Sequence, residues 1–244
     1  MKKILIIVLV LALSLIACEE KTTEDMVLIE AEIINEDNNL IENDFYIAKN
    51  HVTQKEFEEI MGFNPSYFKD ENHSDLTGDS DDRPVENLTW YDAIMYCNKL
   101  SEAEGLDKYY QISDIEYLGE ESGKITHPQS IIDATVKENE AANGYRLPTE
   151  KEHIYATANA RMTYREGNNS KTKVVGENEA NNFGLHDMTT NVNDWTNTLS
   201  GSNRVIRGGY QIYPPSYCGI NYSYNYSPAA SINQIGFRLA RNYH

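Results

Sequence analysis

The chain has 244 residues, of which 40% are hydrophobic and 24% are charged, an ordinary composition for a globular protein. Its formal charge is −17, because 38 acidic side chains face 21 basic ones. A charge this negative argues against binding nucleic acid or anionic lipid through a basic face, and it is compatible with cation binding. The 17 tyrosines are the one unusual count, and their amphipathic rings suit both core and recognition surfaces.

The N-terminus has the pattern of a secretory signal. A positive Met1-Lys2-Lys3 segment precedes an apolar run from Ile4 to Ile16, which is shorter than the roughly 20 residues that span a bilayer. The run ends in Leu15-Ile16-Ala17-Cys18, which resembles the lipobox of bacterial lipoproteins. The resemblance implies cleavage before Cys18 and lipidation of its thiol. The alternative is an ordinary secretory signal with Cys18 at the cleavage point by chance.

Composition divides the chain into three parts. We expect a lipoprotein signal peptide over residues 1–17, an acidic tether over 18–43 and one folded domain over 44–244. The tether lacks Gly and Pro and carries one apolar patch, from Val27 to Ile34, which is a candidate edge strand. The mature protein is therefore expected to be exported and lipid-anchored to the cell membrane or the outer membrane.

Local signals within the domain predict both helices and strands. Thr89 is a good N-cap for a helix whose apolar residues recur at helical spacing, and Thr149 with Glu152 forms a capping box for a second helix. Short strands are expected over 204–207 and 235–240. Short helices followed by a loop-rich, strand-bearing half predict an α+β fold with much irregular structure.

Seven segments along the chain form a recognisable pattern. They begin at Val52-Thr53-Gln54, Pro84-Val85-Glu86, Tyr96-Cys97-Asn98, Gly144-Tyr145-Arg146-Leu147-Pro148-Thr149-Glu150, Phe183-Gly184-Leu185, Arg204-Val205-Ile206-Arg207-Gly208-Gly209 and Gly236-Phe237-Arg238-Leu239. In this order, and over roughly residues 44–241, they resemble the sulfatase-modifying-factor family, whose type member is the formylglycine-generating enzyme. The resemblance implies a C-type-lectin-like fold in its formylglycine-generating-enzyme variant.

The family resemblance also implies a copper oxidase chemistry, which this chain does not match. Family members oxidise a substrate cysteine to formylglycine with two cysteines, five positions apart, that hold Cu(I). Here Cys218 falls at the second position but Tyr213 falls at the first. A phenol with a pKa of about 10 is a poor Cu(I) ligand, so we do not expect copper. Cys218 is the remaining catalytic candidate, or a bystander, and Cys97 is expected to pack in the core.

The pocket implied by the resemblance is rich in tyrosine instead. Tyr210 stands where the family usually has Ser, and the segment after Cys218 lacks the family's arginines. Rigid amphipathic rings suit recognition of a protein or glycan, although the same loop could be packed by its own tyrosines. The predicted binding surface consists of Tyr210, Tyr213, Tyr217, Tyr222 and Tyr224, together with Tyr226.

A structural calcium ion is the cofactor that the resemblance implies. The matching ligand positions are Asp187, Thr190, Val192 and Asp194, which would supply carboxylate and backbone oxygens. Asp194 is one methylene shorter than the family's Glu, and Thr190 lacks the backbone freedom of Gly. The six histidines show no metal-ligand spacing, so we do not expect zinc or iron.

Two functions remain open from the sequence. The first is a lipid-anchored binding or scaffold module, without oxidase activity, for a protein or glycan of the cell envelope. The alternative is a diverged formylglycine-generating oxidoreductase that acts on a cysteine in a sulfatase-type peptide. Neither function involves nucleic acid, and the membrane is contacted only through the lipid anchor.

Overall fold

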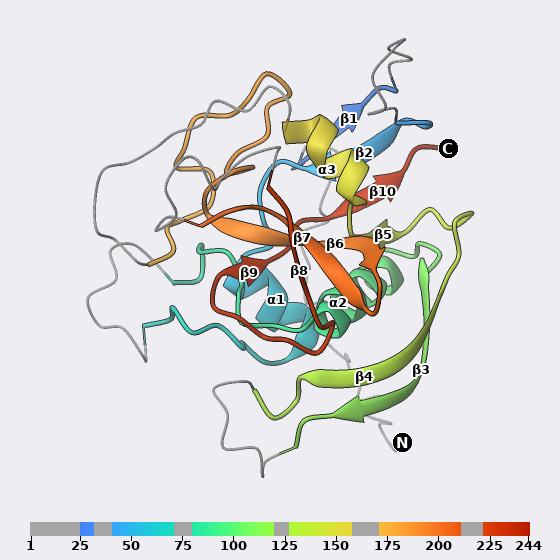
Figure 1. Cartoon of the computed structure of the whole chain (residues 1–244), viewed down its shortest axis with the longest axis vertical. Helices are drawn as coiled ribbons and strands as arrows, with labels where there is room; N and C mark the ends of the chain where they lie inside the picture. The colour runs from blue at the N-terminus through green and yellow to red at the C-terminus, as the bar shows by residue number, and fades with distance from the viewer. Residues whose placement is uncertain (1–24, 32–40, 71–79, 120–126, 158–170, 211–221) are drawn as a thin grey trace, which may run out of the picture.

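The computed structural model describes residues 25–31, 41–70, 80–119, 127–157, 171–210 and 222–244 (Figure 1). Within these residues, three helices accompany ten short strands that are arranged in three separate sheets. The predicted α+β class, with much irregular structure, is confirmed. In this part of the chain no helix is long and apolar enough to cross a membrane.

The first sheet joins the two ends of the domain. Its antiparallel order is β1 (Met26–Ile29), β2 (Phe45–Ala48), β10 (Ala240–Asn242) and β5 (Tyr145–Arg146). The expected edge strand is thus present as β1. Ile29 of β1 and Ile41 are both buried, so the folded domain includes residues that composition assigned to a tether.

The second sheet has the order β8 (Tyr224–Tyr226), β7 (Asn203–Gly209), β6 (Val192–Ser200) and β9 (Ile235–Gly236). The predicted strand at 204–207 lies in β7. The predicted strand over 235–240 is divided between β9 and β10, which belong to different sheets. Gly236 lets the chain pass close to the segment before α2, because a Cβ on it would lie 2.3 Å from the carbonyl oxygen of Val85.

A two-stranded ribbon lies outside these sheets. It consists of β3 (Tyr110–Tyr117) and β4 (Ile131–Glu138), and most of its residues are exposed. Figure 1 shows the ribbon extending along one side of the domain, below α2. The backbone N–H of Ile131 donates to Asp92 Oδ1 at 2.8 Å, which attaches the start of β4 to the first turn of α2.

Three helices complete the domain: α1 (Gln54–Met61), α2 (Trp90–Ala103) and α3 (Glu150–Thr157). Both predicted N-termini are confirmed. Thr89 and Asp92 form a reciprocal capping box on α2, and the Thr149 hydroxyl accepts from the Glu152 N–H at 3.2 Å while Thr149 N–H donates to Glu152 Oε2 at 2.7 Å.

The main core lies between α1, α2 and the second sheet. Phe57 of α1 stacks on Tyr96 of α2 with ring centroids 5.6 Å apart, and Phe237 packs against both rings. Trp90 and Trp195 are also buried there. Each such aromatic contact adds about 0.5–1.5 kcal/mol beyond area burial, so this cluster fixes the helices beneath the sheet.

Candidate functional site

The predicted catalytic and lipidation residues fall largely outside the described part of the chain. Cys18, Tyr213, Tyr217 and Cys218 all lie in ranges for which no structure is described. Cys97 is described and is 0% exposed in the main core. The prediction that Cys97 packs in the core is therefore confirmed.

The predicted tyrosine surface separates into a buried part and an exposed part. Tyr210 is 2% exposed and packs in a small cluster with Phe68 and Val192, so its ring does not lie on the surface as expected. Tyr222 and Tyr224 are 39% and 37% exposed, and Tyr226 is 36% exposed. Only these last three are presented to solvent among the tyrosines of this set that the structure describes.

Two of the exposed tyrosines, Tyr224 and Tyr226, belong to edge strand β8, and Tyr222 precedes it. Tyr224 pairs with Ile206 of β7 and Tyr226 pairs with Arg204, so the two rings share one face of the sheet. The guanidinium carbon of Arg204 lies 3.6 Å from the ring centroid of Trp90, a cation–π contact that fixes this side chain. The rings of β8 therefore lie beside an arginine side chain that is held in place.

A buried polar cluster surrounds Asp194, the carboxylate predicted to bind calcium. Asp194 is 0% exposed, and its Oδ2 accepts hydrogen bonds from His153 Nε2 at 2.9 Å and from Arg238 Nε at 3.0 Å. We refer to Asp194, His51, His153 and Arg238 as the Asp194 cluster. Its members come from four segments. His51 precedes α1, His153 lies on α3, Asp194 lies on β6, and Arg238 lies in the connection from β9 to β10.

His51 lies on the other side of the same carboxylate. Its Nε2 is 3.2 Å from the carbonyl oxygen of Val192 and 3.1 Å from Asp194 Oδ1. Arg238 Nη2, which can only donate, lies 3.2 Å from His51 Nδ1. His51 is therefore the tautomer that carries hydrogen on Nε2. That hydrogen points at the carbonyl oxygen of Val192. Asp194 Oδ1 lies close to the same nitrogen but has no well-aligned hydrogen bond.

Electrostatics keep Asp194 ionised in spite of its burial. Burial alone would raise its pKa, but His51 and Arg238 outweigh that effect and hold the pKa of Asp194 well below its ordinary value. Burial also lowers the pKa of His153, which favours a neutral imidazole that donates through Nε2. The Asp194 carboxylate and the Arg238 guanidinium thus form a buried ion pair with two imidazoles around it.

Sequence reasoning missed most of this cluster. The histidines were set aside because they lack metal-ligand spacing, and Arg238 was noted only as part of the Gly-Phe-Arg-Leu segment. The available signal was Arg238 itself, because an arginine within the apolar segment 235–240 needs an anionic partner once that segment is buried.

Asp187, another residue predicted to bind calcium, already has two hydrogen-bond donors on its carboxylate. The carboxylate of Asp187 accepts from the backbone N–H of Gly176 at 2.9 Å and from Asn178 Nδ2. Asn178 Nδ2 also lies 3.2 Å from Thr190 Oγ1. N–H groups thus point at the Asp187 carboxylate, at Asp194 Oδ2 and at the Val192 carbonyl, which are oxygens that a calcium ion would need, so these three residues as arranged do not fit the ion. Within the described ranges, no group of three or more His, Cys, Asp or Glu side chains has the geometry to hold a metal ion.

A second buried acid lies in the segment before α2. Glu86 is fully buried, and its Oε1 accepts from the backbone N–H of Phe68 at 2.8 Å. Burial raises the pKa of Glu86 to about 8, against the opposing effect of the N–H groups of Phe68 and Tyr67. This carboxyl is therefore largely protonated at neutral pH.

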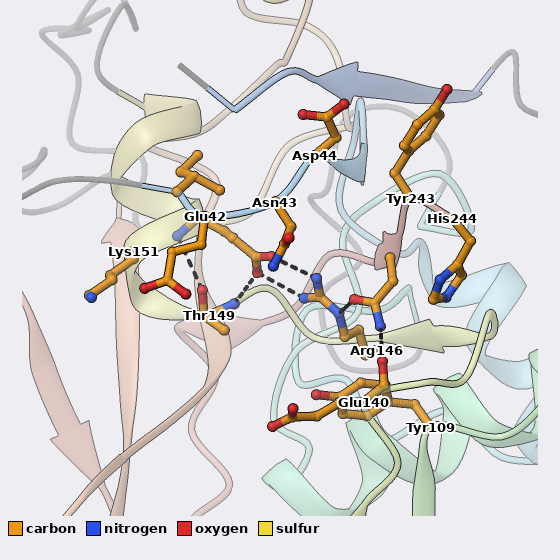
Figure 2. A pocket seen from close by; sticks show the side chains of 13 residues that line it. Glu42, Asn43, Asp44, Tyr109, Glu140, Arg146, Thr149, Lys151, Tyr243 and His244 are labelled. Carbon is orange, nitrogen blue, oxygen red and sulfur yellow. Dashed lines mark hydrogen bonds and ion pairs between the residues drawn. The ribbon is translucent and has the colours of Figure 1, made fainter. Parts of the chain in front are cut away.

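A polar recess of about 560 Å³ opens between α3, β5 and the end of β10 (Figure 2). Its floor is Arg146, which binds Glu152 through Nη1 at 2.8 Å and Nη2 at 2.6 Å and donates from Nε to Asn242 Oδ1 at 2.7 Å. These groups satisfy one another, and the residues that line the recess include no thiol or activated hydroxyl. The other lining residues are Ile41, Glu42, Asn43, Asp44, Tyr109, Glu140, Thr149, Lys151, Tyr243 and His244.

Comparisons with known proteins agree with the segment order seen in the sequence. The family model described as a sulfatase-modifying factor enzyme 1-like domain matches residues 17–243. Chaperone protein LppX of Paenibacillus barcinonensis is 32% identical, and the alignment covers 99% of this chain and 100% of that protein.

Solved structures share the fold. Treponema denticola variable protein 1 superposes with a TM-score of 0.69 at 27% identity, covering 89% of this chain and 95% of that one. CarF superposes with a TM-score of 0.64 at 22% identity, covering 90% of this chain and 98% of that one. PvdO from Pseudomonas aeruginosa gives 0.57 at 16% identity, with 89% and 94% covered. At these lower identities, CarF and PvdO show the fold alone.

Proposed function

Since the chain belongs to the family of sulfatase-modifying factor enzyme 1-like domains, we propose that it is a binding module of the cell envelope without copper oxidase activity. In this proposal a lipid on Cys18 anchors the domain, whose architecture is the C-type-lectin-like variant of the formylglycine-generating enzyme. The ligand is a protein, with a glycan as the second class to be tested.

The number and positions of the cysteine thiols carry the proposal. After lipidation of Cys18, the sequence retains only Cys97 and Cys218 as thiols. Cys97 lies on α2 and is 0% exposed in the main core, so its side chain is used for packing. Tyr213 replaces the other cysteine of the family pair. A Cu(I) site of two thiolates then lacks one ligand, and soft thiolates are what Cu(I) selects.

The exposed tyrosines in and next to β8 supply the binding chemistry. Tyrosine contributes large contact area at low entropic cost, because it has two side-chain torsions and a terminal hydroxyl. Tyr222, Tyr224 and Tyr226 are exposed at one edge of the second sheet, which is an accessible position for an extended polypeptide. The Paenibacillus barcinonensis relative is called a chaperone protein, which supports a polypeptide ligand for this chain as well.

A client-binding assay tests the proposal. A reporter protein is diluted from denaturant, and its light scattering is followed with the domain present in stoichiometric amount. We expect the wild-type domain to suppress scattering, and the double variant Tyr224→Ser/Tyr226→Ser to lose most of this effect. Tyr117→Ser is the matched control, since Tyr117 is 55% exposed on β3, away from β8. Equal suppression by all three proteins, or retention of the domain on a glycan array instead, would contradict a polypeptide ligand at β8.

The oxidase alternative has its own assay. The purified protein is incubated with Cu(I), oxygen and a Cys-X-Pro-X-Arg peptide, and the peptide mass is measured. We expect the cysteine to remain unmodified. Conversion to formylglycine that disappears in Cys218→Ser would establish the oxidoreductase and overturn the absence of oxidase activity.

A further inference from the structure

We propose that N–H donors of His51 and Arg238 have taken the position of the family's structural calcium ion, so that this domain folds and stays folded without calcium. The inference concerns the interior of the domain and is independent of any ligand at β8. Two of the four predicted ligand positions, Val192 and Asp194, carry it directly, and a third, Asp187, is bound by other donors.

The first is the backbone carbonyl of Val192. His51 Nε2 lies 3.2 Å from this oxygen and 3.1 Å from Asp194 Oδ1, so a single N–H group stands between two of the oxygens that would coordinate calcium. Calcium binds oxygen at about 2.3–2.6 Å. An ion bound to both oxygens would overlap the imidazole, and the ring is held in place by Arg238 at Nδ1.

The second is the carboxylate of Asp194. Its Oδ2 is already bound by two donors, His153 Nε2 and Arg238 Nε. Arg238 brings a full positive charge to this oxygen, and it is buried on all sides. A divalent ion placed beside that guanidinium would be repelled strongly in a low-dielectric interior. The charge that calcium would neutralise is already neutralised.

The third is the carboxylate of Asp187, which accepts from Gly176 N–H and from Asn178 Nδ2. Arg238 also reaches this segment, because its Nη2 donates to the carbonyl of His186 at 3.0 Å. Arg238 Nη1 lies 3.2 Å from the carbonyl of Ala48 and 3.3 Å from that of Lys49, at the end of β2. One guanidinium thus connects the segments that a structural ion would otherwise hold together.

The replacement agrees with the side chain at position 194. Aspartate is one methylene shorter than glutamate, so its carboxylate stays close to β6, where β9 pairs in parallel with Asp194 opposite Gly236. Arg238 follows Gly236 by two residues, so the pairing of β9 with β6 places its guanidinium next to the Asp194 carboxylate. The cation of the site is part of the polypeptide.

Calcium binding by the intact mature domain tests the proposal directly. Equilibrium dialysis with radioactive calcium and thermal unfolding are measured for wild type, Asp194→Asn and Asp187→Asn. We expect the same weak, non-saturating binding in all three, which reports the acidic surface, and a wild-type Tm that differs by less than about 1 °C between calcium and chelator.

A resident ion would give a different result. Calcium at 100 times its dissociation constant would raise the Tm by roughly 5–10 °C in a domain of this size. One saturable calcium per chain that raises the Tm and is lost in Asp187→Asn overturns the proposal. Asp187→Asn keeps an acceptor for Gly176 N–H, so this comparison remains decisive if Asp194→Asn does not fold.

Discussion

Two strands of the same sheet, β6 and β8, lie on either side of β7 and use their side chains in opposite ways. β6 carries Asp194, a fully buried charge that is bound by residues from three other segments. β8 carries Tyr224 and Tyr226, large rings that remain partly exposed. The usual distribution, with charges outside and rings inside, is reversed at both places.

The difference separates stability from recognition. A buried ion pair is valuable only while every partner is present, so the Asp194 cluster constrains four segments at once. Exposed rings on an edge strand contribute little to folding and leave their contact area available to a ligand. Substitutions in β6 should therefore affect unfolding, whereas substitutions in β8 should affect binding, and β7 between them should show an intermediate effect.

The largest effect is expected for Asp194→Asn. The variant leaves the guanidinium of Arg238 buried without a counter-charge, which should lower the free energy of unfolding by about 3–5 kcal/mol. Urea denaturation measures the change. Glu102→Gln is the matched control, because Glu102 makes an exposed pair with Lys108 and should cost less than about 1 kcal/mol. A loss as small as the control's would mean that the cluster does not hold the domain together.

A pH-dependent effect is expected at Glu86. Its folded pKa of about 8 lies above the unfolded value, so its contribution to stability is fully present below the unfolded pKa and is lost as the pH rises to about 8. Glu86→Gln keeps the acceptor for Phe68 N–H and removes the titration. Unfolding free energies measured from pH 5 to 8 should shift in favour of the variant by about 1 kcal/mol per pH unit. Parallel pH profiles would show that Glu86 ionises normally.

A smaller effect is expected in β7. Gly208 has φ of +106°, and a Cβ there would lie 3.2 Å from the carbonyl oxygen of Val192, the oxygen that His51 approaches. Gly208→Ala should therefore cost about 1–3 kcal/mol in urea denaturation. Gly201→Ala is a useful comparison, since Gly201 also has positive φ but has open space around its Cβ position. If both variants lose the same amount, backbone conformation alone accounts for the cost at Gly208.

The smallest effect on stability is expected in β8. Tyr224→Ser and Tyr226→Ser should each change the free energy of unfolding by no more than about 0.5 kcal/mol, because their rings are partly exposed at a sheet edge. Their loss should still weaken client binding by about tenfold or more, as expected for aromatic residues at an interface centre. Titration of a fluorescent client measures the affinity. A large stability loss with unchanged affinity would assign these rings to packing.

Local sequence signals were enough for the elements whose causes are local. Thr89 and Thr149 predicted two helix starts, since a capping box depends on residues three positions apart. Cys97 was assigned to the core from helical spacing. The β3–β4 ribbon was not predicted, because its residues alternate weakly and are mostly exposed. The strand predicted over 235–240 was found, but not its division between two sheets.

The sequence by itself determined the family, the α+β class and the missing thiol at Tyr213, because these follow from the order and identity of residues along the chain. Only the tertiary structure decided the partners of Asp194. His51 and Arg238 are separated by 187 positions, and their contact through Nδ1 and Nη2 exists because β9 pairs beside β6 and the chain then returns next to β2. Ion pairs in a protein interior are selected by distance and desolvation, and neither quantity can be read from spacing along the chain.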